Sequence, residues 1–153
     1  MGIFQKGQGA TEYLVLLAVV LIIALVSIAL LGFFPGLATD ARITQSNSYW
    51  RGEARPFAIL EHTVGTSGNA TLIVQNYDAS GTLTVTNLTV GAGSNGTSMS
   101  FAPGEIRTVS VANVVSSPSA GQVYDLAVTF SYNTSNGVAS KQYGSKNIIG
   151  KVS

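Results

Sequence analysis

The first 34 residues constrain this chain more than any other part of it. A short polar leader ends at Lys6-Gly7, Glu12 follows five residues after Gly7, and an uncharged apolar run extends from Tyr13 to Phe34. An ordinary secretory signal places its apolar core before the cleavage site, so the core is lost on processing. Here the candidate processing site, after Gly7, precedes the apolar run. Cleavage there would keep the hydrophobic segment, either as a membrane anchor or as a building element.

The apolar run is long enough to cross a lipid bilayer. From Leu14 to Phe34 it has about 21 residues, a helix of roughly 32 Å, against a bilayer core of about 30 Å. Because it is apolar on every face, it must be buried all round, by lipid or by identical neighbouring helices. A plain single-pass anchor is the simplest alternative. Such an anchor needs neither Lys6-Gly7 before the helix nor Glu12 at its start.

The segment from Lys6 to Leu17, KGQGATEYLVLL, resembles the class III signal peptides of type IV pilins, and of archaeal pilins most closely. In that family a membrane peptidase cuts after the glycine. The resemblance therefore implies a leader of residues 1–7, cut between Gly7 and Gln8, with Glu12 as the fifth mature residue. Gln8 in the first position is the euryarchaeal version, whereas bacterial pilins usually begin with phenylalanine. Thr11 departs from the serine of many relatives.

The resemblance implies a structural subunit of an extracellular adhesion filament on the cell surface, and not an enzyme. Its partners would be identical subunits in a helical homopolymer, the prepilin peptidase and the pilus assembly machinery, with a single-pass membrane stage before assembly. Glu12 is expected to act in assembly by meeting the Gln8 amine of the next subunit. The local alternative is that Glu12 caps its own helix and pairs with its own amine.

Two further assignments remain open at this point. One is an archaellin, the subunit of the archaeal swimming filament, which shares the leader and a β-sandwich head. The other is a minor pilin-like anchor for a surface domain that binds a solute or a sugar in a concave aromatic site. The aromatic candidates for that site, which core packing explains equally well, are Phe57, Tyr77, Tyr124 and Tyr143.

Composition argues against several other classes of function. Charged residues make up 10% of the chain, well below the roughly 25% of ordinary soluble domains. Loss of the leader removes Lys6 from the eight basic residues and leaves seven of each sign. A neutral chain without a basic patch is not expected to bind nucleic acid. The chain has no cysteine, which excludes disulfides and thiolate chemistry.

The residues after the apolar run predict a stalk and then an all-β head. Pro35-Gly36 is expected to interrupt the helix, which resumes over Leu37 to about Tyr49 and gives way to a linker over Trp50–Pro56. Short β-rich runs bounded by turn signals then predict about seven strands. These are Phe57–Val64, Ala70–Tyr77, Thr82–Val90, Thr97–Phe101, Ile106–Ala112, Val123–Tyr132 and Val138–Ile148.

The expected fold class is α+β. A hydrophobic helix and stalk would occupy residues 8–50, and a head of about 98 residues would occupy residues 56–153. Seven strands in a head of this size fit an immunoglobulin-like sandwich, which the resemblance also implies, although a small barrel has the same strand count. In Thr82–Val90 the apolar phase slips between Val85 and Leu88, which predicts a β-bulge near Asn87.

Four Asn-x-Ser/Thr sequons lie in the predicted head, at Asn69, Asn87, Asn95 and Asn133. Most fall at predicted strand ends or turns, which favours exposed N-glycans on a surface filament. The alternative is ordinary turn chemistry, because asparagine and threonine suit turns in any case. The phase slip in the strand of Asn87 leaves open which face of the strand this asparagine occupies.

No catalytic, cofactor or metal site is expected. Gly91–Gly96 matches GxGxxG, but the segment after it contains Pro103 and cannot form the helix that a dinucleotide site requires. His62, the single histidine, stands beside Glu61 and is expected to be structural or exposed rather than an acid or a base. No acidic cluster has the spacing of a calcium loop.

Overall fold

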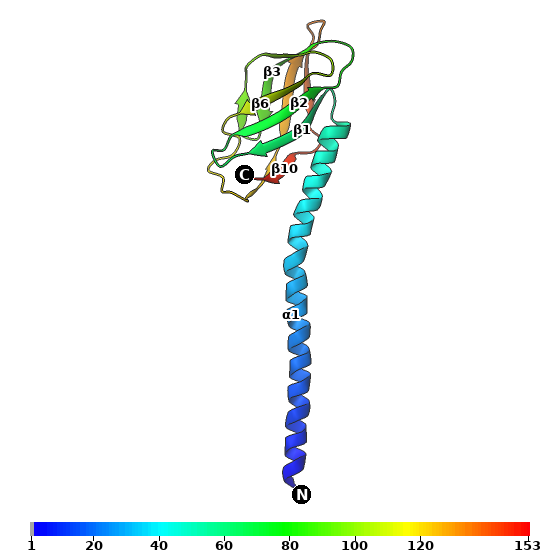
Figure 1. The fold of residues 1–153 in the computed structure, drawn as a ribbon, viewed down its shortest axis with the longest axis vertical. Coiled ribbons are helices and arrows are strands. Elements are labelled where there is room, and N and C mark those ends of the chain that lie inside the picture. Colours follow the sequence, from blue (N-terminus) through cyan, green and yellow to red (C-terminus); the bar gives the residue numbers. More distant parts are fainter. Residues whose placement is uncertain (1) are drawn as a thin grey trace. The chain divides into compact units, whose positions relative to one another are not determined.

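The computed structural model describes residues 2–153, apart from the side chains of residues 2–6, 33 and 34. Two compact units make up the chain, Met1–Ala41 and Arg42–Ser153. The first is helical, and the second contains the last turns of the helix and all of the strands (Figure 1). The α+β class expected from the sequence is confirmed.

Helix α1 runs from Gly2 to Ser48 without a break, although Pro35 lies inside it. The expected interruption at Pro35-Gly36 is therefore wrong. A proline inside a helix costs about 3 kcal/mol because it removes one backbone donor and crowds the preceding turn. Leucine and alanine on both sides favour helix and reduce the net cost, although Gly32 and Gly36 add to it. The Thr39 hydroxyl also donates to the Pro35 carbonyl at 3.2 Å.

A single π-helical turn, η1 (Tyr49–Glu53), follows α1 where the sequence predicts a linker. The turn closes where the Ala54 amide donates to the Tyr49 carbonyl at 3.0 Å. Trp50 is fully buried by it, so the segment is part of the core rather than a loose connection. A buried tryptophan so close to the end of α1 fixes the entry of the chain into the sandwich.

Ten antiparallel strands follow, where about seven are expected. They are β1 (Phe57–Val64), β2 (Ala70–Asn76), β3 (Leu83–Val90), β4 (Gly93–Asn95), β5 (Met99–Phe101), β6 (Ile106–Val111), β7 (Val123–Leu126), β8 (Val128–Asn133), β9 (Ala139–Tyr143) and β10 (Ile148–Lys151). Two predicted strands are each divided in two: Val123–Tyr132 into β7 and β8, and Val138–Ile148 into β9 and the start of β10. Strand β4 has no counterpart among the predicted strands.

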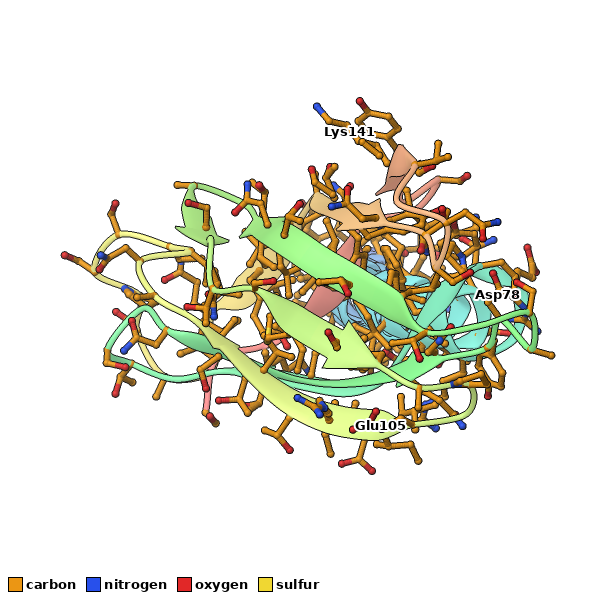
Figure 2. The ribbon with its side chains drawn as sticks, turned by 90° about the horizontal axis from the view of Figure 1, so that it is seen from above. Asp78, Glu105 and Lys141 are labelled. Atoms are coloured by element: carbon orange, nitrogen blue, oxygen red, sulfur yellow. The ribbon has the colours of Figure 1, made fainter. Side chains whose placement is uncertain are left out.

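The strands form three sheets. One has the order β1-β2-β6, a second has the order β4-β3-β8-β9 with β5 also beside β3, and a third consists of β10 and β7. In immunoglobulin terms β1, β2 and β6 take the places of strands A, B and E, whereas β3, β8 and β9 take those of C, F and G. Seen from above, the strands lie in layers with side chains between them (Figure 2). The head is therefore a sandwich, and not the barrel that the strand count also allows.

The predicted bulge is confirmed. The register between β3 and β8 shifts between Val85 and Asn87, so one extra residue of β3 opposes the partner strand. The shift brings both apolar phases of β3 to the same side, and Leu83, Val85, Leu88 and Val90 are all buried. A regular strand would have turned half of these side chains towards water, because successive side chains alternate between faces.

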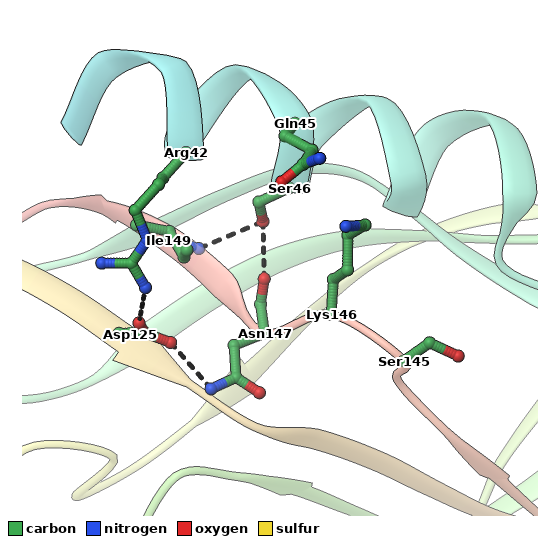
Figure 3. Close-up of a pocket in the computed structure, with 8 residues that line it drawn as sticks. All are labelled: Arg42, Gln45, Ser46, Asp125, Ser145, Lys146, Asn147 and Ile149. Carbon is green, nitrogen blue, oxygen red and sulfur yellow. Dashed lines mark hydrogen bonds and ion pairs between the residues drawn. The ribbon is translucent and has the colours of Figure 1, made fainter. Parts of the chain in front are cut away.

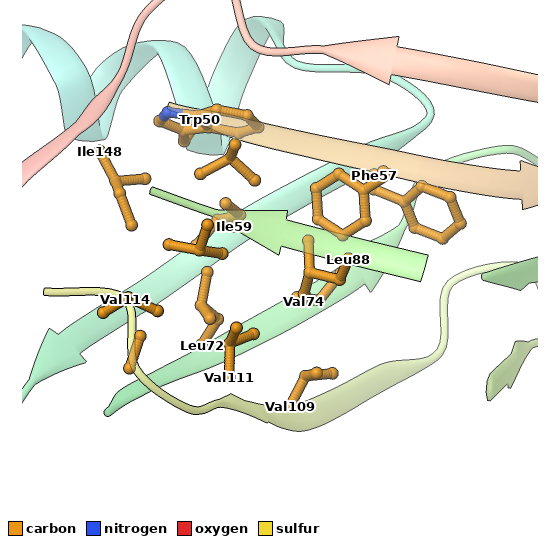
Figure 4. Close-up of a cluster of buried hydrophobic side chains, with 14 of the residues drawn as sticks. Trp50, Phe57, Ile59, Leu72, Val74, Leu88, Val109, Val111, Val114 and Ile148 are labelled. Atoms are coloured by element: carbon orange, nitrogen blue, oxygen red, sulfur yellow. The ribbon is translucent and has the colours of Figure 1, made fainter. Parts of the chain in front are cut away.

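The core lies between the two larger sheets, and Figure 4 shows part of it around Trp50 and Phe57. Phe57 of β1 stacks on Phe130 of β8 with ring centroids 5.0 Å apart, and meets Phe101 of β5 edge-on at 5.5 Å. These rings join the two sheets. Each aromatic side chain removed from water contributes roughly 2–3 kcal/mol, so the cluster is a principal source of stability.

A glutamine side chain joins the edges of the two larger sheets. Gln142 of β9 is 6% exposed, and its amide makes two hydrogen bonds to the backbone of Phe57 in β1. The Phe57 amide donates to Oε1 at 2.9 Å, and Nε2 donates to the Phe57 carbonyl at 2.7 Å. This side chain therefore takes the place of a neighbouring strand along one residue of β1.

Candidate functional site

The predicted processing and assembly residues all lie in α1. Apart from its chain neighbours and the backbone of its own helix, nothing lies within 4 Å of the place that a Cβ would take at Gly7, so packing in the monomer does not require a glycine there. The Thr11 hydroxyl donates to the Gly7 carbonyl at 3.0 Å. Glu12 is exposed and lies beside Val15 and Leu16 one turn later, at the start of the apolar segment.

The apolar segment after Glu12 has no cover within the described monomer. Its large side chains from Tyr13 to Leu31 are between 42% and 68% exposed. Helix α1 is long and apolar enough to cross a membrane. Monomeric proteins rarely expose a continuous apolar surface of this extent, and such surfaces mark contacts with lipid or protein. The segment is therefore the clearest candidate for an interaction surface.

Three side chains on one face of α1 and η1 attach the helix end to the sandwich. Arg42, Ser46 and Trp50 are spaced four residues apart, which places them on one side of a helix. Arg42 forms an ion pair with Asp125 of β7, and the Asn147 side chain donates to the same carboxylate at 2.7 Å. Figure 3 shows these contacts around a polar hollow of about 340 Å³.

Ser46 is the most buried of the polar contacts in this attachment, at 1% exposure. Its hydroxyl donates to the Asn147 carbonyl at 2.6 Å and accepts from the Ile149 amide at 3.3 Å (Figure 3). One hydroxyl thus satisfies two backbone groups next to β10. The sequence contains no signal for this role, since a serine late in a helix is ordinary.

Trp50 completes the attachment. Its ring lies so close to Gly144, between β9 and β10, that a Cβ there would come within 2.3 Å of the ring. Gly144 is therefore required by packing, and it lies where the predicted strand Val138–Ile148 is divided into β9 and β10. The Tyr49 hydroxyl accepts from the Ser145 amide at 3.0 Å and holds the same connection.

His62 is held on both sides by hydrogen bonds. Nε2 lies 3.1 Å from Asn47 Oδ1, near the end of α1, and Nδ1 lies 2.8 Å from the Tyr124 hydroxyl of β7. Because a carbonyl oxygen only accepts, Nε2 carries the proton and Nδ1 accepts from the tyrosine. Both ring nitrogens are engaged, so the geometry favours a structural role for this histidine.

Burial, the larger cause, and the positive charge of Arg51 together lower the pKa of His62 to about 4. The unfolded chain takes up a proton near pH 6.5, whereas the native protein stays neutral down to about pH 4. Stability is therefore expected to fall as the pH falls through this window, by about 3 kcal/mol in all. Hydrogen bonds lower the pKa values of two carboxyl groups in the sandwich: that of Asp78, chiefly through Ser80, and that of Glu105, chiefly through the Ala102 amide.

Urea unfolding of the full chain in detergent micelles, followed by Trp50 fluorescence, measures this dependence. The midpoint should be clearly lower at pH 4.5 than at pH 7. In the variant His62→Gln, which keeps hydrogen-bonding capacity but does not titrate, most of the difference should disappear. An equal pH dependence in wild type and variant would assign the effect to other groups.

The sequon asparagines differ in accessibility. Asn69 is exposed in the loop between β1 and β2, and only its oxygen is engaged, by the Asn113 amide at 3.2 Å. Asn87 and Asn133 are half-buried on the paired strands β3 and β8. Asn95 is the most constrained, because its Nδ2, the glycan attachment atom, donates to the Ser110 carbonyl of β6 at 2.8 Å. Accessibility thus favours Asn69 over Asn95.

The other residues singled out from the sequence are not brought into one site. Phe57 lies in the core and Tyr124 faces His62, whereas Tyr77, just after β2, and Tyr143 of β9 are exposed. The glycine-rich segment Gly91–Gly96 forms a tight turn and β4, with no helix after it. In the part of the chain that the structure describes, no three His, Asp or Glu side chains are grouped to hold a metal.

Comparison with protein-family models finds none that matches this chain, and comparison with curated proteins finds no significant match.

Proposed function

We propose that this chain is the structural subunit of an extracellular type IV-like filament of the archaeal pilin type. The observation that carries the proposal is the exposed apolar segment of α1, preceded directly by Lys6-Gly7 and Glu12. A surface of this kind requires lipid or apolar protein on every side. A leader that is removed ahead of the segment would leave it free to pass from the membrane into a polymer.

Identical helices are the partners that match this surface. Leucine, valine and isoleucine dominate the segment, so helices of neighbouring subunits can replace lipid without burying a charge. A head-to-tail contact that does not close into a ring generates a helical fibre. The sandwich, which has its own core, would then form the outer layer and carry the glycans.

Glu12 supplies the polar contact in this proposal. After removal of the leader, the α-amine of Gln8 is a cation close to the start of the apolar segment. We propose that Glu12 of one subunit pairs with the Gln8 amine of the next, which sets the axial register. Within a dry filament core such a pair gains more than it would in water, because screening is weak there.

The position of the mature N-terminus tests the proposal. Cells that make this chain should release, on shearing, a high-molecular-weight fraction whose dominant protein begins at Gln8, by N-terminal sequencing and mass spectrometry. Electron microscopy should show filaments in the same fraction. The variant Gly7→Leu, which adds bulk next to the scissile bond, should accumulate with residues 1–7 attached and form no filaments.

Two results would contradict the proposal. If the mature chain begins at Met1 in wild-type cells, the leader is not removed and the helix is a plain anchor. If cleavage occurs beyond Phe34, the apolar segment is a conventional signal and is absent from the mature protein.

A further inference from the structure

A small pocket opens at the end of the sandwich where β1 begins and where β2 and β8 end. Its volume is about 420 Å³, and its principal lining residues are Arg55, Tyr77, Asp78, Tyr132 and Thr134. Pockets of about 300–1,000 Å³ with aromatic walls and a few polar groups are the usual form of small-ligand sites. This pocket belongs to the sandwich alone and does not depend on polymerisation.

The walls of the pocket are held in place by their own contacts. The Arg55 guanidinium lies 4.3 Å from the centre of the Tyr77 ring and donates to the Ala54 carbonyl at 2.8 Å. The Tyr132 ring packs edge-on against Phe57, with centroids 5.3 Å apart. Stacked and packed rings lose little entropy when a ligand binds, so these walls suit binding.

The polar groups of the pocket retain hydrogen-bonding capacity. The Asp78 amide donates to the side chain of the buried Asn76 at 2.9 Å, and Ser80 donates to Asp78 Oδ1. Asp78 Oδ2 therefore remains as an acceptor. Thr134 accepts from the Val138 amide at 3.1 Å, which leaves its own hydrogen to donate. Arg55 has further N–H donors beyond the one directed at Ala54.

The charges in the pocket favour a neutral ligand. Arg55 and Asp78 carry opposite charges, so an anion would meet the carboxylate and a cation would meet the guanidinium. A neutral polyol uses both, because its hydroxyl groups donate to Asp78 and accept from Arg55. Its non-polar C–H face can lie against a tyrosine ring, whose face is the negative part of the quadrupole.

We propose that this pocket binds a neutral sugar residue of a surface glycan or polysaccharide. Tyr77 and Tyr132 provide the aromatic wall, Asp78 accepts from the sugar hydroxyls, and Arg55 and Thr134 donate to them. The sugar can come from a foreign polysaccharide or from an N-glycan of the filament itself, since Asn133 stands next to Thr134 in the chain. The recognition chemistry is the same for both sources.

Saturation-transfer NMR on the full chain in detergent micelles tests the proposal, with protein made in a host without N-glycosylation. The probes are methyl α-mannoside, methyl β-galactoside and N-acetylglucosamine as neutral sugars, and glucuronate as an acidic one. At least one neutral sugar should bind in the millimolar range, and glucuronate should bind more weakly. Tyr77→Ala and Asp78→Asn should each weaken binding at least tenfold, whereas Tyr143→Ala, an exposed tyrosine outside the pocket, should leave it unchanged.

Trp50 fluorescence verifies that each variant is folded, so a loss of binding is not a loss of structure. Absence of binding by all three neutral sugars, preference for glucuronate, or unchanged binding in folded Tyr77→Ala would overturn the proposal.

A comparison with glycosylated filament protein then distinguishes the two sources of the sugar. Binding that is blocked in the glycosylated protein and restored by Asn133→Gln assigns the pocket to the filament's own glycan; equal binding in both assigns it to a foreign one. Filament yield of the variants is a separate readout and reports on the proposed function.

Discussion

A lysine at Val20 is expected to abolish filament formation. Val20 lies in the middle of the apolar segment and is 61% exposed in the monomer, so a filament would bury it against neighbouring helices. An unpaired buried charge costs several kcal/mol, and the cost recurs in every subunit of the polymer. Filament mass in the sheared fraction of Val20→Lys cells should fall at least a hundredfold.

The matched control is Val20→Leu, which changes size but not polarity and should give normal filaments. The amount of each variant in the membrane fraction must also be measured, because lysine at the centre of a membrane helix costs about 2.5–3.5 kcal/mol. An otherwise apolar helix of this length is expected to remain inserted. Normal filaments from Val20→Lys cells would exclude this segment from the filament core.

The same assay separates the two roles considered for Glu12. Glu12→Gln keeps the size and polarity of the side chain but removes its charge. If the charge pairs with a neighbouring Gln8 amine, processing should continue while filament yield falls sharply. Wild-type yield would leave Glu12 with only a local role at the start of its helix.

Replacement of Gln142 by leucine is expected to destabilise the sandwich strongly. Leucine fills a similar volume, but it leaves the amide and the carbonyl of Phe57 without partners in a buried place. Each unsatisfied buried group costs about 1–3 kcal/mol, so the free energy of unfolding should fall by about 2–6 kcal/mol. This is a large part of the stability of a typical domain.

Urea unfolding of the full chain in micelles, with Trp50 fluorescence as the signal, measures the loss. Gln45→Leu is the matched control, because Gln45 is exposed on α1 and should change stability by less than about 0.5 kcal/mol. A Gln142→Leu midpoint equal to that of the control would mean that the Phe57 backbone finds other partners and that the bridge is dispensable.

Local patterns in the sequence were sufficient for much of the fold. The β1 bounds agree with the prediction at both ends, and β2, β3 and β6 agree to within one residue. The phase slip around Asn87 predicted the bulge, because a strand with both phases apolar must shift its register to bury them. These features depend only on neighbours in the chain, which is why they can be read from one sequence.

The divided strands could not be predicted in the same way. Apolar and polar side chains alternate from Tyr124 to Tyr132. This pattern is the same whether the strand stays in one sheet or passes from one sheet to another at Ala127. The requirement for a glycine at position 144 comes from the Trp50 ring, about a hundred residues earlier in the chain. The bridge from Gln142 to Phe57 likewise joins two distant segments. Periodicity carries no information about such contacts.

The candidate functional residues also include some that the sequence could predict and some that it could not. Gly7, Gln8 and Glu12 were singled out from their order along the chain, and their role still rests on that order. The pocket that we propose as a sugar site was not predicted as it stands, since only Tyr77 of its lining residues was considered for an aromatic site. Arg55, Asp78 and Thr134 are separated in sequence and have no shared motif, so only the fold brings them together.

If the chain polymerises as proposed, the spacing of Arg42, Ser46 and Trp50 has a mechanical consequence when the filament is under tension. Force transmitted along α1 would reach the sandwich through these three side chains one after another, each a turn farther from the pulling end. The first is an exposed ion pair worth less than about 1 kcal/mol, the second is a buried hydroxyl with two partners, and the third is a fully buried indole ring. The contacts between the end of α1 and the sandwich would therefore break one after another, each at a higher force than the one before. Loss of the last contact, that of Trp50, would expose the hydrophobic core.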